Sequence, residues 1–168
     1  MNKAFKVALG EYGVRETPGS KHNPRVVEYF AKVGHSWVKD DETAWCAAFV
    51  GFCLETAGIN STKKLNARSY MDWSVPSITP QIGDIVVFWR GSKSGWQGHV
   101  GFYIGETDTG ILTLGGNQSD QVFIATYPKN QLLGYRKVPT EISADCKLSN
   151  FTLIELINEV IVRLPKQQ

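Results

Sequence analysis

Cys46 is the residue whose type and position point most directly to chemistry. It lies in the first turn of an expected helix at about 44–57, in the stretch TAWCAAFV. Unpaired backbone N–H groups and the positive end of the helix dipole stabilise a thiolate at such a place. The same groups could hold the oxyanion that forms when an amide carbonyl is attacked. Cys46 could instead be an ordinary buried cysteine, a description that suits Cys53 better.

The acidic run at 40–42 lies just before this helix. If these carboxylates were close to Cys46, they would raise the pKa of its thiol. A paired imidazolium would offset that effect, and the sequence supplies a candidate in His99.

His99 is the candidate general base, in the stretch GHVGFYIG at 98–105. On the strand expected there, His99 and Gly101 share one face. Because Gly101 has no side chain, another element can approach beside the imidazole, and we expect the Cys46 helix to occupy that space. The alternative is a surface histidine at the end of a strand.

Asn117 is the third candidate, in the stretch LGGNQSD at 114–120, after the next expected strand. A Cys–His pair usually needs a third group that fixes the imidazole tautomer. Asn117 could accept a hydrogen bond from the second ring nitrogen, although it could also be a turn residue beside two glycines. Together, Cys46, His99 and Asn117 predict nucleophilic attack on an amide.

The elements that must position these residues follow an α+β pattern, with helices before strands. Asn23 and Pro24 are a strong helix start, and Thr43 or Asp41 could cap the helix that carries Cys46. Periodicity predicts helices near 4–12, 24–33, 44–57 and 67–73. Strand patterns at 85–89, 99–105, 111–114, 122–127 and 133–138 predict an antiparallel meander. A capping box and an apolar run predict a last helix at about 153–164, so we expect a domain at 1–139 and a helical extension at 140–168.

The totals exclude several classes of protein. A chain of 168 residues has the size of one domain, and a net charge of +2 argues against a dedicated nucleic-acid binder. The three cysteines form no disulfide framework, and no ligand spacing typical of zinc is present, so we expect no metal and no cofactor. No stretch approaches the roughly 20 apolar residues that span a bilayer, so we expect no stable membrane insertion.

Four stretches resemble the CHAP family, the cysteine- and histidine-dependent amidohydrolases and peptidases. They are WCAAF at 45–49, GDIVVF at 83–88, GHVG at 98–101 and GN at 116–117, and the resemblance spans roughly residues 3–138. It implies a papain-like fold related to the NlpC-type cell-wall peptidases, with N-terminal helices on an antiparallel meander. By position it implies Cys46 as nucleophile, His99 as base and Asn117 as orienting residue. Many relatives carry a Glu two residues before this Asn, where the chain has Gly115.

The resemblance also implies a peptidoglycan hydrolase that cuts an amide bond of the stem peptide, or its junction with muramic acid, through an acyl-enzyme. The sequence does not say which bond. Alternatives are a non-catalytic module that binds cell-wall peptide and an acyl transferase that uses the same cysteine. Candidates for lining a substrate groove are Trp45, Tyr70, Trp96 and Gln118, although core packing would explain the tryptophans equally well.

The N-terminal stretch lacks the apolar run of a signal peptide, so we expect synthesis in the cytoplasm. Action on the wall, in the periplasm or outside the cell, would then follow release as a phage lysin or delivery as an antibacterial effector. An effector could have an immunity protein or delivery machinery as partners. The helix at 153–164 could dock on its own domain or form a dimer.

Overall fold

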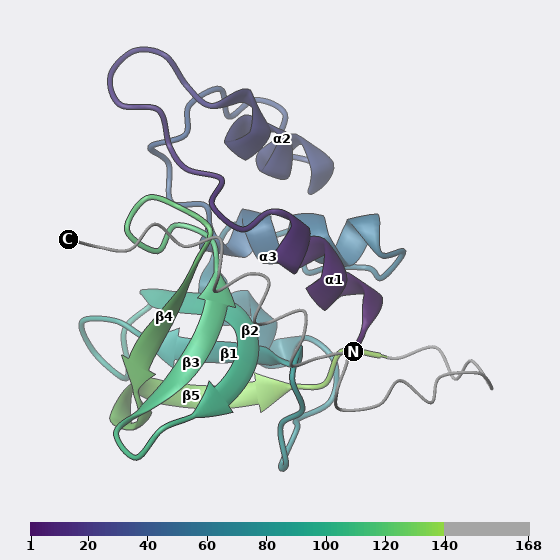
Figure 1. Cartoon of the computed structure of the whole chain (residues 1–168), viewed down its shortest axis with the longest axis vertical. Coiled ribbons are helices and arrows are strands. Elements are labelled where there is room, and N and C mark those ends of the chain that lie inside the picture. The colour runs from purple at the N-terminus through teal and green to yellow at the C-terminus, as the bar shows by residue number, and fades with distance from the viewer. Residues whose placement is uncertain (140–168) are drawn as a thin grey trace.

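The computed structural model describes residues 1–139; the helical extension expected at 140–168 lies outside the described residues. Helices come first and strands second, which confirms the α+β class (Figure 1). The helices are α1 (Lys3–Gly10), α2 (Pro24–Lys32) and α3 (Cys46–Thr56), with short 3-10 helices η1 (Ala67–Asp72) and η2 (Lys129–Gln131). The strands are β1 (Ile85–Trp89), β2 (Gly98–Glu106), β3 (Gly110–Gly115), β4 (Phe123–Pro128) and β5 (Leu132–Arg136).

Asparagine caps set the start of the first two helices. The Asn2 side chain accepts a hydrogen bond from the Phe5 N–H at 2.8 Å, and Asn23 accepts one from Arg25 at 2.9 Å. Pro24 occupies the first turn of α2, so the predicted start of this helix is confirmed.

Helix α3 begins differently, because its N-cap residue Trp45 makes no side-chain cap hydrogen bond. The expected cap from Thr43 or Asp41 is therefore wrong. The Asp41 carboxylate instead accepts hydrogen bonds from the backbone N–H groups of Thr17 and Asn23, both at 2.8 Å. The N-cap residue thus supplies no side-chain acceptor to the first N–H groups of α3, which begins at Cys46.

The sheet has the strand order β4-β3-β2-β1-β5, and all its pairs are antiparallel. Strands β1 to β4 form the predicted meander. Strand β5 does not continue from β4 but pairs with β1 at the opposite edge. Only the short η2 separates β4 from β5, so the sheet must curl until its two edges come close, as Figure 1 shows.

The curled sheet buries side chains on both faces. Toward α1 and α3, the main core includes Phe5, Phe49, Val100 and Phe102, and the rings of Phe49 and Phe102 meet edge to face at 6.4 Å. On the other face, Val86, Phe88 and Ile111 form a second buried cluster with partly buried tyrosines. Strand β2 therefore lies between two apolar layers.

None of the helices within residues 1–139 is long and apolar enough to cross a membrane.

Helix α3 does not use the space beside Gly101, contrary to our expectation. A Cβ at Gly101 would lie 2.5 Å from the Thr113 side chain and 2.8 Å from the Leu114 carbonyl oxygen, so β3 fills this space. The glycine that admits α3 is Gly116, where a Cβ would run into the ring of Trp45. The close approach of α3 is therefore at the end of β3, directly after Gly115.

Candidate active site

Cys46 is the first residue of α3 and is nearly buried, with 8% of its surface exposed, whereas Cys53 has none. Burial raises the pKa of the Cys46 thiol above its ordinary value. Hydrogen bonding from the Val100 backbone, the charge of Arg90 and hydrogen bonding from the helix start act in the opposite direction. Burial, rather than the acidic run at 40–42, is therefore the main influence, and it favours the protonated thiol.

Gln118 is the residue that holds the imidazole of His99. Its side-chain oxygen lies 2.9 Å from Nε2 of His99, and both residues are buried. The amide nitrogen of Gln118 donates to the backbone oxygens of Thr113, at 3.2 Å, and Phe123. Because these two oxygens can only accept, the Gln118 oxygen must face His99, and Nε2 must carry the hydrogen. Nδ1 is then left with its lone pair.

That second nitrogen, His99 Nδ1, is buried and has no hydrogen-bond partner among the described residues. The expected pairing of Cys46 with His99 is therefore not made through a hydrogen bond in this structure. The backbone N–H of Val100, the residue after His99, is close enough to the sulfur to act on the pKa of the Cys46 thiol. The structure thus brings Cys46 close to Val100 on β2. Val100 directly follows His99, whose Nδ1 has no hydrogen-bond partner among the described residues.

The imidazole is neutral in this environment. Burial, together with the nearby charge of Arg90, lowers the pKa of His99 to about 3, and the hydrogen bond with Gln118 offsets only part of this. The imidazolium that we expected to pair with the thiolate is therefore wrong for this state. A protonated thiol and a neutral imidazole suit general-base catalysis, in which the thiol loses its proton as it attacks.

Two residues of the site were missed in the sequence. The ring of Tyr127, on β4, stacks on His99 with centroids 4.7 Å apart, and Phe88 stacks on Tyr127 at 4.6 Å. Arg90 follows β1 directly, is exposed, and its charge acts on Cys46, His99 and Tyr127. The stack fixes the plane of the imidazole. Only the curl of the sheet, which turns β4 toward the start of β2, brings Tyr127 there.

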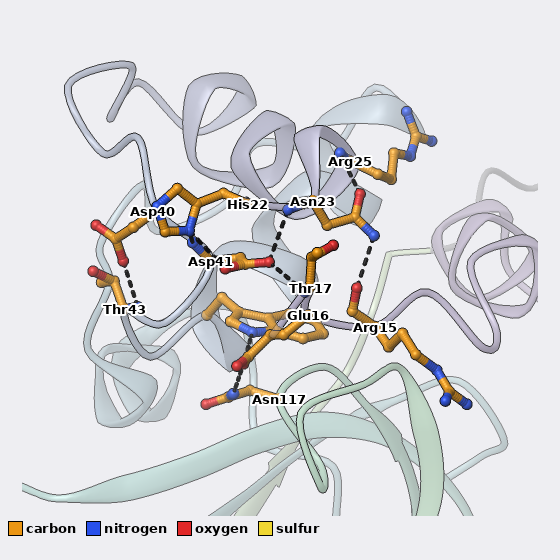
Figure 2. A network of polar contacts seen from close by, with 11 residues as sticks. Arg15, Glu16, Thr17, His22, Asn23, Arg25, Asp40, Asp41, Thr43 and Asn117 are labelled. Atoms are coloured by element: carbon orange, nitrogen blue, oxygen red, sulfur yellow. Dashed lines mark hydrogen bonds and ion pairs between the residues drawn. The ribbon is translucent and has the colours of Figure 1, made fainter. Parts of the chain in front are cut away.

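Asn117 is not bonded to His99. Its side-chain nitrogen donates to Oε1 of Glu16 at 2.8 Å, and the same oxygen accepts from the indole nitrogen of Trp45 at 2.7 Å (Figure 2). The position expected for Asn117 is taken by its neighbour Gln118.

Gly115 explains this exchange. A Cβ at residue 115 would lie 3.1 Å from Nε2 of His99 and 2.8 Å from the Gln118 oxygen. The missing side chain leaves the space that Gln118 fills. Two features of the sequence could have indicated this: the absence of the usual Glu at 115, and an amide residue directly after Asn117.

The four groove candidates occupy very different places. Trp45 and Tyr70 have no exposed surface, so in this structure they are core residues and cannot line a groove. Gln118 is 3% exposed and is engaged with His99. Only Trp96, which is 75% exposed on the loop between β1 and β2, is available to a substrate. Within residues 1–139, no group of three or more His, Cys, Asp or Glu residues could hold a metal ion.

Comparison with protein-family models matches residues 38–117 to the CHAP domain, just under half of the 168 residues. No curated protein matches the chain. Among solved structures, the chain is similar to one described as similar to a lipoprotein of the NLP/P60 family, from Staphylococcus aureus subsp. aureus Mu50, with 15% identity and a TM-score of 0.42. That match covers 75% of this chain and 45% of the other, so the chain spans less than half of that protein's length.

Proposed function

We propose that this chain hydrolyses an amide bond of peptidoglycan. The premise is that residues 38–117 belong to the CHAP family of cysteine- and histidine-dependent amidohydrolases and peptidases. The bond would lie in the stem peptide or at its junction with muramic acid. One observation carries the proposal most directly: Gln118 holds the Nε2 side of His99, which leaves a buried Nδ1 without a partner among the described residues.

In the proposed reaction, the Cys46 side chain first turns toward Nδ1 of His99. Nδ1 takes the thiol proton while the sulfur attacks the amide carbon, and the carbonyl electrons move to the oxygen. The N–H groups at the start of α3, which no side chain caps, receive this oxyanion. As the C–N bond breaks, Nδ1 returns the proton to the leaving amine and a thioester remains on Cys46.

Water then releases the acyl group. His99 Nδ1 removes a proton from the water molecule, whose oxygen attacks the thioester carbon. As the C–S bond breaks, the leaving sulfur takes that proton from Nδ1. Throughout both halves, Gln118 keeps a hydrogen on Nε2, so that Nδ1 takes up and returns the proton, and Tyr127 keeps the ring in one plane. The positive charge of Arg90 favours the negative sulfur in both half-reactions.

We also propose that Trp96 contacts the glycan part of the substrate. Its loop is held by the Arg68 guanidinium, which donates to the carbonyl oxygens of Gln97 at 2.8 Å, Lys93 at 2.9 Å and Ser92 at 2.8 Å. An exposed indole on a fixed loop loses little freedom on binding, which favours stacking on a sugar ring. Trp96 is three residues from His99, so it lies within about 10 Å of it along the chain.

The setting remains a separate proposal: a phage lysin, or an effector delivered into a competing cell. Purified protein applied to permeabilised cells should lyse them in either case. An effector should in addition be toxic when directed to the periplasm and be neutralised by a co-expressed immunity protein. A lysin should reach and cut the wall once a pore has opened in the membrane, without delivery machinery.

The proposed activity is tested by mass spectrometry of purified peptidoglycan after incubation with the protein. We expect shortened stem peptides or peptides freed from muramic acid. Cys46→Ala and His99→Ala should yield neither product. Cys53→Ala is the matched control and should retain the products, because Cys53 is fully buried and takes no part in the reaction.

The other outcomes would contradict the proposal. New peptide linkages would indicate a transferase, and binding without any change in the peptidoglycan would indicate a binding module. Full activity of Cys46→Ala would show that Cys46 is not the nucleophile.

A further inference from the structure

A single carboxylate oxygen joins the two halves of the candidate site. Oε1 of Glu16 accepts one hydrogen bond from the Trp45 indole at 2.7 Å and another from the Asn117 side chain at 2.8 Å (Figure 2). Trp45 directly precedes Cys46, and Asn117 directly precedes Gln118. Glu16 therefore links the start of the nucleophile's helix to the loop that holds the imidazole.

That loop has three residues in the left-handed region, which most side chains disfavour and which asparagine and aspartate tolerate best. Asn117, Ser119 and Asp120 have φ values of 55°, 52° and 58°, in the left-handed region that favours glycine. Gln118 stands among these three residues. Such a loop persists only where its surroundings hold it, and its orientation decides whether Gln118 reaches His99.

The segment that carries Glu16 provides this hold through its backbone as well. The Glu16 N–H donates to the Asp120 carbonyl oxygen at 2.8 Å, and the Val122 N–H donates to Val14 at 2.7 Å. Beside it, Arg15 pairs with Gln121 as an isolated β-bridge. The loop is thus bordered by a strand-like stretch that comes from far away in the sequence.

The segment is itself fixed on its other side. Just after Glu16, the Thr17 N–H donates to the fully buried carboxylate of Asp41, which also lies 3.0 Å from Nδ1 of His22 (Figure 2). Asp41 belongs to the stretch that leads into α3. Glu16 is therefore anchored near both elements that it joins.

We propose that Glu16 is a positioning residue for the hydrolytic reaction, which sets the Cys46 helix relative to the Gln118–His99 pair. This inference rests on the proposed function. Glu16 touches neither reacting group, so its removal should alter the catalytic rate constant and leave substrate binding nearly unchanged. Without the carboxylate, the Trp45 and Asn117 donors lose their acceptor, and the loop is free to leave its left-handed conformation.

The test compares three variants by kcat and KM on soluble peptidoglycan fragments, with rates corrected for the folded fraction. For Glu16→Ala we expect kcat to fall by about 10²-fold, at the low end of what a misplaced general base costs, with KM nearly unchanged. Glu16→Gln keeps an acceptor oxygen at the same place and should restore most of the rate. Glu11→Ala is the control for stability, because Glu11 accepts hydrogen bonds from Arg25 and Tyr29, both at 2.8 Å, whereas Glu16 is the acceptor for Trp45 and Asn117.

Glu11→Ala should lower the melting temperature without lowering kcat per folded molecule. The inference is overturned if Glu16→Ala retains the wild-type kcat, or if Glu11→Ala loses as much activity as Glu16→Ala. Nitrogen-15 NMR of the His99 ring gives a second readout that needs no turnover. Glu16→Ala should lose the Nε2–H tautomer that Gln118 imposes, and retention of that tautomer would also contradict the inference. If the wild-type protein proves inactive, the proposed function fails while this readout still decides the role of Glu16.

Discussion

Replacing Gln118 by Ala should inactivate the enzyme far more than replacing Asn117, the residue that sequence reasoning selects. The change removes the acceptor for His99 Nε2–H and the two hydrogen bonds to Thr113 and Phe123. The buried Nε2–H of His99 and the buried carbonyl of Thr113 then lose a partner, at a cost of about 1–3 kcal/mol each, so the free energy of unfolding should fall by at least ~2 kcal/mol. With no group to hold the tautomer, kcat/KM should fall by about 10²–10⁴-fold.

The assay measures kcat/KM for both alanine variants at a temperature where circular dichroism shows each to be folded. Asn117→Ala should lose only about 10-fold, because Asn117 acts on the site through Glu16 rather than on the imidazole, and a lost hydrogen bond to a carboxylate costs about 1.5 kcal/mol. Gln118→Glu is an informative third variant, since a carboxylate beside His99 favours the imidazolium and should raise its pKa. If Asn117→Ala loses as much activity as Gln118→Ala, or more, the assignment of Gln118 is refuted.

Four further predictions rest on the site and its packing. Because His99 must be neutral to act as base and burial lowers its pKa to about 3, kcat/KM should stay high well below pH 6.5; an acidic limb centred on the ordinary histidine value would contradict this. The same depressed pKa means that His99 should withdraw stability as pH falls below 6.5 toward 3, which thermal melts of wild type and His99→Gln would detect as a difference. Gly116→Ala should destabilise the fold by about 1–3 kcal/mol or more, because its Cβ would collide with Trp45, whereas Gly105→Ala, with open space around it, should be nearly neutral in chemical denaturation. Trp96→Ala should weaken hydrolysis of glycan-linked stem peptides more than that of free stem peptides, and Trp37→Ala, an equally exposed tryptophan elsewhere, should affect neither.

Local signals in the sequence were sufficient for most of the elements. Asn23 and Pro24 open α2 because an asparagine cap and a proline in the first turn act over a few residues, independently of the rest of the fold. The strands were found through runs of β-branched and aromatic residues. The pairing of β5 with β1 was not found, since it depends on how strongly the whole sheet curls.

The same distinction separates the parts of the site. Cys46 at a helix start and His99 on β2 follow from local sequence, and both are where they were expected. Whether they form a catalytic pair stays a prediction. The partner of His99 depended on which side chain fills the space left by Gly115, and that is a matter of three-dimensional packing.

Burial explains the remaining differences. The expected thiolate–imidazolium pair assumed an accessible site, whereas both groups lie almost completely within the protein. Burial disfavours charge on each of them and so produces a neutral thiol and a neutral imidazole. Sequence patterns indicate the helix or strand on which a group lies. They do not indicate how far the group is buried from water.

The tautomer of His99 is the most direct test of the central claim, that Gln118 holds Nε2–H so that Nδ1 is the base for Cys46. Nitrogen-15 NMR at neutral pH, with His99 assigned by comparison with His99→Gln, reports which ring nitrogen carries the proton. We predict a neutral ring with the proton on Nε2 and none on Nδ1. A ring protonated on Nδ1, or on both nitrogens, would contradict the account.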